Sequence, residues 1–134
     1  MNSLERVLAK ISGSPSDLPA VTLTLSLYGA RLIGSPLKDY YTIPNAYIEG
    51  QIAVKERFNP DILFTPFALT AEGESFGSQV KFFEKNPPNI SKSAVKFAED
   101  VLKIEMPDVN SHPRLSFIRD AIRGIAAKFG KDTA

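Results

Sequence analysis

Two glutamates and one histidine are the side chains of this 134-residue chain best suited to proton transfer or metal binding. Glu72 and Glu74 stand two positions apart, so on a helix they point in different directions and cannot form a facing acid–base pair. His112 is the single histidine and lies in a predicted turn beside Pro113, where an imidazole is usually solvated. The chain has no cysteine. We therefore expect no metal ion or other cofactor bound by this chain alone, and neither a thiol nucleophile nor a disulfide.

The charge and composition exclude several classes of function. Sixteen basic and fifteen acidic residues are mixed along the chain, so we expect no nucleic-acid partner and no anionic membrane surface. Glu5 and Arg6 stand where a signal peptide needs an apolar core, and no segment has the composition of a membrane span. We expect a cytoplasmic protein. The four tyrosines have no basic cluster beside them, which favours packing over base stacking.

Hydrophobic periodicity predicts alternating helices and strands, that is, an α/β fold in a single domain spanning residues 1–134. Apolar residues at every third or fourth position favour helices, whereas short apolar runs bounded by proline, asparagine or glycine favour strands. The predicted helices cover residues 4–11, part of 26–34, 36–41, 44–58, 69–76, 93–104 and 113–129. The predicted strands cover residues 20–25, 62–64 and 79–83.

Local signals define the ends and buried faces of these helices. Asn2 and Glu5 have the spacing of a capping box, and Gly13 stands where a left-handed residue ends a helix. The predicted apolar face of the 44–58 helix consists of Tyr47, Ile48, Ile52 and Phe58. That of the 93–104 helix consists of Val95, Ala98, Val101 and Leu102. The strongest stripe comprises Leu115, Ile118, Ala121, Ile122, Ile125, Ala126 and Phe129.

Four stretches in this order resemble the N-terminal region of the uroporphyrinogen decarboxylase superfamily. They are residues 5–19, residues 29–40, the segment Phe58-Asn59-Pro60-Asp61-Ile62-Leu63-Phe64 with its continuation to Gly77, and residues 119–130. The third stretch is the most specific, since its strand, paired glutamates and closing glycine are similar to those of methylcobalamin:coenzyme M methyltransferases. The resemblance covers nearly the whole chain.

The resemblance implies the N-terminal portion of a (β/α)₈ barrel. A complete barrel needs on the order of 250 residues, so this chain would hold an incomplete one. Residues 131–134 would then lie at the threshold of the third barrel strand, with only two barrel strands complete. The predicted strand at 79–83 would belong to a small additional element, either an inserted hairpin or a small flanking sheet.

The resemblance also implies where a substrate would bind. The decarboxylases of the superfamily hold the acetate groups of a tetrapyrrole with two arginines after the first strand and an aspartate after the second. Arg31 matches the second arginine, whereas Leu27 and Ala68 stand where the first arginine and the aspartate belong. An apolar side chain cannot replace a charge-matched partner, so these departures argue against decarboxylation. We predict substrate-binding roles for Arg31 and Glu72, with Thr65 and Thr70 as further side chains that could line the same cleft.

Three functions follow, in order of preference. The first is part of a corrinoid-dependent methyltransferase, which transfers a methyl group from a methylated corrinoid protein to a thiol and is inactive as this chain alone. The resemblance implies a zinc site for that reaction, with histidine and cysteine ligands from strands outside this chain, and a corrinoid protein as partner. The second is uroporphyrinogen decarboxylase of porphyrin biosynthesis, with a tetrapyrrole-like ligand. The third is a noncatalytic interaction or assembly module.

Unpaired strand edges give a further expectation. Two parallel strands without neighbours expose backbone donors and acceptors, together with the apolar faces of their helices. We therefore expect a homo-oligomer in which copies of the chain cover these surfaces.

Overall fold

The computed structural model describes residues 1–134 as helices with one two-stranded sheet, an α/β arrangement. In chain order they are α1 (Ser3–Ser12), α2 (Tyr28–Ile33), α3 (Leu37–Tyr40), α4 (Pro44–Phe58), α5 (Ala71–Ser75), β1 (Gln79–Lys81), β2 (Asn89–Lys92), the 3₁₀ helix η1 (Ala98–Lys103) and α6 (Pro113–Phe129). None of these helices combines the length and hydrophobicity that crossing a bilayer requires.

Three segments meet in parallel at one place, and this contact organises the fold. Thr22 and Ile62 form a parallel bridge, with the Asp61 amide donating to the Val21 carbonyl over 2.7 Å. On the other side, the Leu63 amide donates to Ala134 over 2.8 Å, and the Ala134 amide donates to Asp61 over 3.1 Å. Ile62 therefore lies between Thr22 and Ala134, as in three successive strands of a parallel sheet. The end of the chain lies where the predicted third strand would begin.

The predicted barrel strands are shorter than the sequence suggested. Residues 20–25 and 62–64 meet in one bridge instead of forming extended ladders. The side chains on the first segment are also open to solvent, with Val21 and Thr22 both exposed. A parallel strand is normally covered on both faces, whereas consecutive residues 21–24 of this segment, which point to opposite faces, are all exposed. The barrel is therefore open.

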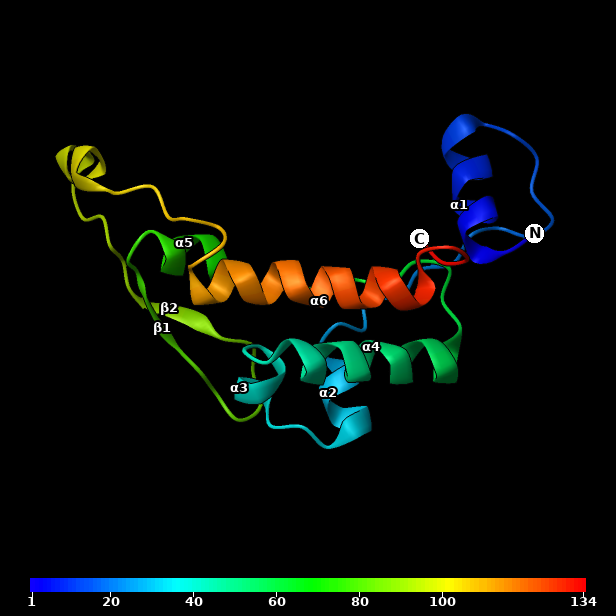
Figure 1. Ribbon diagram of the computed structural model, residues 1–134, viewed down its shortest axis with the longest axis horizontal. Helices are drawn as coiled ribbons and strands as arrows, with labels where there is room; N and C mark the ends of the chain where they lie inside the picture. The colour runs from blue at the N-terminus through cyan, green and yellow to red at the C-terminus, as the bar shows by residue number, and fades with distance from the viewer.

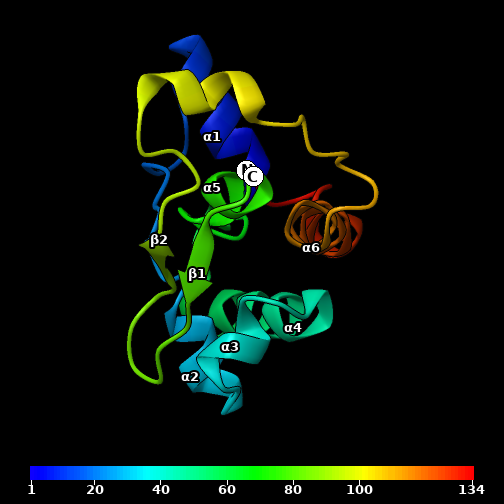
Figure 2. The same ribbon diagram turned by 90° about the vertical axis from the view of Figure 1, so that its left-hand side faces the viewer.

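Helices α4 and α6 lie side by side and run in the same direction, as the helices of successive β/α units do (Figure 1). Both were predicted from their apolar periodicity, and their bounds agree with the sequence. Seen end-on, α2 and α3 lie against α4 on the side away from α6 (Figure 2). Gly29 of α2 and Gly50 of α4 allow this crossing, because a Cβ on Gly50 would lie 2.9 Å from the carbonyl carbon of Gly29.

The buried centre is rich in tyrosine, and its hydroxyl groups are satisfied by hydrogen bonds. Tyr40 donates to the Ser26 carbonyl over 2.7 Å and accepts from the Gln51 amide over 3.0 Å. Tyr47 packs against Tyr40 at a ring-centroid distance of 4.8 Å. Burial raises the pKa of both phenols, so they are neutral at ordinary pH. Packing therefore accounts for these tyrosines, as predicted.

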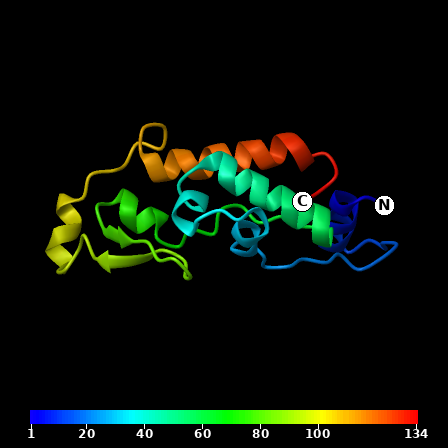
Figure 3. The ribbon, with the colours of Figure 1, turned by 90° about the horizontal axis from the view of Figure 1, so that it is seen from below.

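Ionic contacts join α1 to Asp17 and to Asp61, the residue just before the bridge at Ile62. Arg6 pairs with Asp17 at 2.8 Å and with the buried Asp61 at 3.3 Å. The Arg6 guanidinium holds the pKa of the Asp17 carboxyl well below its usual range. The capping box of Asn2 and Glu5 is present at the start of the same helix. Both chain termini lie at the same end of the molecule as α1 (Figure 3).

The additional hairpin exists, with a second strand that the sequence analysis did not predict. Strand β1 pairs with β2 in antiparallel orientation, Lys81 opposite Asn89, so residues 82–88 form the connection. All four residues of β2 are exposed, which explains why periodicity gave no signal for it. Together with α5, the hairpin lies at the end of the molecule where α4 and α6 begin (Figure 1).

Two predicted apolar faces are wrong in part. Phe58 at the end of α4 is 39% exposed, whereas the buried face of that helix is formed by Tyr47, Gly50, Gln51 and Val54. The predicted 93–104 helix is reduced to the short η1, in which Leu102 is 89% exposed. This segment projects from the body, so its apolar residues gain no stabilisation from burial (Figure 1).

Candidate functional site

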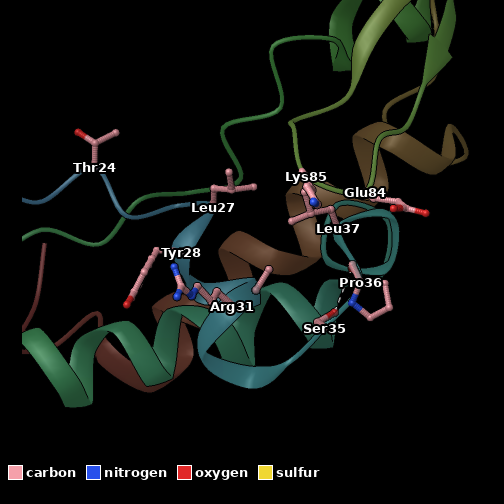
Figure 4. A pocket seen from close by; sticks show the side chains of 10 residues that line it. Thr24, Leu27, Tyr28, Arg31, Ser35, Pro36, Leu37, Glu84 and Lys85 are labelled. Carbon is pink, nitrogen blue, oxygen red and sulfur yellow. Dashed lines mark hydrogen bonds between the residues drawn. The ribbon is translucent and has the colours of Figure 1, made fainter.

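The largest cavity lies at the carboxyl end of the first barrel segment and contains the predicted Arg31. Its volume is about 740 Å³. The lining comes from the first segment, α2, the start of α3 and the β1–β2 connection, as Figure 4 shows. Its residues are Thr24, Leu27, Tyr28, Ala30, Arg31, Ser35, Pro36, Leu37, Glu84 and Lys85. Ligands of β/α barrels bind at this end of the strands.

Buried polar contacts hold the helix that carries Arg31. The Ser26 carbonyl, just before α2, accepts hydrogen bonds from Tyr40 at 2.7 Å and Gln51 at 3.4 Å. Gly34 ends the helix in the left-handed conformation, with φ of 66°. Between these two fixed points, the Arg31 guanidinium lies 5.8 Å from the centre of the Tyr28 ring, a cation–π contact. Arg31 is exposed and has no carboxylate partner, so it is free to contact an anion.

Leu27 and Ala68, the two positions that depart from the decarboxylase pattern, differ from each other in their surroundings. Leu27 and Arg31 both line the cavity (Figure 4), so the apolar side chain of Leu27 forms part of its wall. Ala68 is buried in the same core cluster as Ala71 and Tyr41. An aspartate at position 68 would need hydrogen-bond partners inside this cluster.

The structure separates the two glutamates, as their spacing predicts. Glu72 is exposed and does not line the cavity of Arg31, so these two predicted binding residues are not brought together. Glu74 faces α6, where its Oε2 lies 2.6 Å from Nε of Arg114. Thr70 is buried with no hydrogen-bond partner for its hydroxyl, whereas Thr65 is exposed. The polar residues predicted around the second strand therefore do not converge on one cleft.

Arg114 is the polar residue that the sequence analysis missed. It is 5% exposed, lies over the rings of Phe82 and Phe117 at 5.6 and 5.5 Å, and donates through Nη1 to the Tyr41 carbonyl. Its contact with Glu74 is an ion pair rather than an aligned hydrogen bond, and Nη2 has no partner. This one side chain therefore joins α6 to α5, α3 and the hairpin.

A spacing signal for Arg114 exists in the sequence. The buried residues of α6 are Arg114, Phe117 and Ala121, which follow one another at three- and four-residue intervals. The predicted stripe shares Ala121 with this face, and its Ile118 and Ile125 pack against the core cluster. It omitted Arg114 and Phe117 and included Ile122, which is 39% exposed. Arg114 stands three residues before Phe117 on one face of α6, and this spacing indicates that its cationic side chain is buried.

The chain does not supply the ligands of a zinc site. No group of three His, Cys, Asp or Glu side chains lies close enough together to hold a metal ion. His112 is the N-cap of α6, where its Nδ1 accepts a hydrogen bond of 3.3 Å from the Arg114 amide. The donor set of this chain therefore does not fit zinc.

The sequence of this chain matches the model of one protein family. Residues 2–134 match the sequence model of the family Uroporphyrinogen decarboxylase (URO-D). Because the match covers almost the whole chain, the protein belongs to the uroporphyrinogen decarboxylase superfamily. No curated protein matches the chain significantly.

Among solved structures, a methyltransferase from Methanosarcina mazei has a similar fold. The TM-score is 0.80 at 22% sequence identity, and the alignment covers 99% of this chain. It covers only 40% of the methyltransferase chain, so this protein spans less than half the length of that relative. The predicted fold, part of a β/α barrel with an additional hairpin, is thereby confirmed.

Arg114 gives the first testable prediction. Arg114→Met should lower the free energy of unfolding by about 2 kcal/mol, because it leaves the Glu74 carboxylate half-buried without its counter-ion. Arg119→Met is the matched control, since Arg119 pairs with its neighbour Asp120 near the surface, and should cost less than about 0.5 kcal/mol. Chemical denaturation of both variants measures the difference. Equal losses would show that Arg114 does not tie these elements together.

Proposed function

We propose that this chain is the N-terminal part of a corrinoid-dependent methyltransferase, which moves a methyl group from a methylated corrinoid protein to a thiol. The observation that carries the proposal is the combination of membership in the superfamily with a fold that matches a methyltransferase over 99% of the chain. The departures at Leu27 and Ala68 favour this function over decarboxylation.

Decarboxylation of a tetrapyrrole remains the second function, because Arg31 lines the cavity after the first strand. The shortage of matched positive charges argues against this second function. A substrate with several carboxylates needs several matched charges, and Leu27 contributes an apolar wall where one of these charges belongs. A noncatalytic assembly module is the third, supported by the apolar side chains that η1 and its flanks expose.

In the proposed enzyme, this chain contributes binding rather than chemistry. Arg31 would contact an anionic group of the thiol substrate or of the corrinoid, with its guanidinium supported by the Tyr28 ring. Glu72 would contact a partner from the exposed side of α5. The zinc ion, which would lower the pKa of the thiol when bound, would take its ligands from the remainder of the barrel. The cytoplasm would suit such an enzyme, since thiols stay reduced there.

A chimera tests the reaction. Residues 1–134 would replace the corresponding part of the Methanosarcina mazei methyltransferase, and methyl transfer from methylcobalamin to coenzyme M would be assayed beside carbon dioxide release from uroporphyrinogen. We expect methyl transfer by the chimera and none by the 134-residue chain alone. Arg31→Gln should lower kcat/KM about tenfold through loss of a charged hydrogen bond, whereas Arg57→Gln, an exposed arginine outside the cavity, should not.

Decarboxylation by the chimera would contradict this function and support the second. Methyl transfer by the chain alone would contradict the view that catalysis needs the rest of the barrel.

Self-association is the other expectation of the proposal. The Thr22 segment has a free backbone edge, and Val21 and Leu23 beside it are 52% and 37% exposed. The 134-residue chain should therefore form a homo-oligomer, measured by size-exclusion chromatography with light scattering. A monodisperse monomer across the micromolar range would contradict this expectation.

A further inference from the structure

An apolar arm, residues 97–109, projects from the end of the molecule that lies farthest from both termini (Figure 1 and Figure 3). It contains η1 and part of the irregular segment that leads to α6. Five of its large apolar side chains are more than half exposed: Phe97, Val101, Leu102, Met106 and Val109. Single exposed apolar residues are common, whereas a group concentrated in one short projecting segment indicates an interaction surface.

The arm is anchored at both ends, so it leaves the body at a defined place. Before it, the Ala94 amide donates to Oγ of Ser78 over 3.0 Å, and after it Arg119 of α6 donates to the Asn110 side chain over 3.1 Å. Between these anchors, the hydrogen bonds of the arm reach only residues within four positions in the sequence. The arm is therefore presented to a partner rather than packed on its own chain.

The β1–β2 hairpin, at the same end of the molecule, has an apolar hollow beside it. The hollow has a volume of about 470 Å³ and is lined by the hairpin and by the residues just before α5. Leu69, Phe83 and Ile90 contribute apolar walls, and each of these side chains is exposed. Interfaces are commonly anchored by one large side chain that fills such a hollow. Leu102, the most exposed apolar residue of the arm, has the chemistry to fill it.

The arm and the hairpin carry opposite net charge. The arm has four carboxylates and one lysine, whereas residues 79–92 have three lysines and one glutamate. Glu99 and Glu105 on the arm are exposed and form no ion pair in this chain. Lys81 and Lys92 on the hairpin are likewise exposed and form none. Because one chain carries both an acidic arm and a basic hairpin, a second copy offers the complementary charge to each.

We propose that two copies of this chain form a two-fold interface, in which the arm of each copy packs on the hairpin of the other and Leu102 fills the hollow. Both surfaces lie at one end of the molecule, so a two-fold axis there brings each arm against the opposite hairpin. The eight exposed apolar side chains of the two surfaces offer on the order of 100 Å² each, which together reaches the ~800 Å² that each partner buries in a standard interface. This interface is distinct from the Thr22 edge and does not depend on the reaction.

Leu102→Ser tests the anchor. We expect it to raise the dissociation constant of the dimer, measured by sedimentation velocity, about thirtyfold, as loss of a central anchoring side chain does. Ile11→Ser is the matched control, because Ile11 is 77% exposed on α1 and lies outside both surfaces. It should leave the dissociation constant unchanged. A monomeric 134-residue chain, or equal effects of the two substitutions, would overturn the proposal.

Exchange of charges tests the two-fold arrangement. Glu99→Lys with Glu105→Lys reverses the arm, and Lys81→Glu with Lys92→Glu reverses the hairpin. Tagged and untagged copies would be mixed in every combination and their capture measured, with circular dichroism to verify the fold. We expect each reversed variant to fail to capture itself, and the two reversed variants to capture one another, because both contacts are then matched. No capture between the reversed variants would overturn the proposal. So would equal capture in all combinations, the result of association through the Thr22 edge alone.

Discussion

The backbone hydrogen bonds around Ile62 determine the rest of the arrangement. Because Thr22 and Ala134 meet Ile62 from either side in parallel, each connection must return across the molecule, and α4 and α6 do so in the same direction. The carboxyl ends of the segments then share one end of the molecule, where α2, α5 and the hairpin lie. Only the central segment has partners on both sides, so each outer segment keeps a free edge.

This arrangement explains why the site is partly formed. The first segment leads directly into α2 and fixes Arg31 through the contacts of Ser26 with Tyr40 and Gln51. The hairpin brings Lys85 to the same cavity, and Arg114 joins the hairpin to the helices behind it. No group of three metal-ligating side chains lies together in this chain, which spans 40% of the chain of its structural neighbour.

The sequence predicted the features that depend on local physics. Capping by Asn2 and the bounds of α4 and α6 depend on neighbouring residues and are as predicted, whereas the apolar stripe predicted over residues 93–104 is not buried. The single bridge at Thr22, the exposure of Leu102 and the contact of Lys85 with the Arg31 cavity depend on partners distant in sequence. Arg31 was located by family resemblance, whereas Arg114 was missed because a charged residue was excluded from the predicted apolar stripe.

Scalar coupling across hydrogen bonds in NMR spectra tests the parallel order of the three segments. We expect coupling from the Leu63 amide nitrogen to the Ala134 carbonyl carbon, and from the Asp61 amide nitrogen to the Val21 carbonyl carbon, with slow hydrogen exchange at both amides. Absence of both couplings, with rapidly exchanging amides at Asp61 and Leu63, would contradict the parallel sheet and the partial barrel built on it.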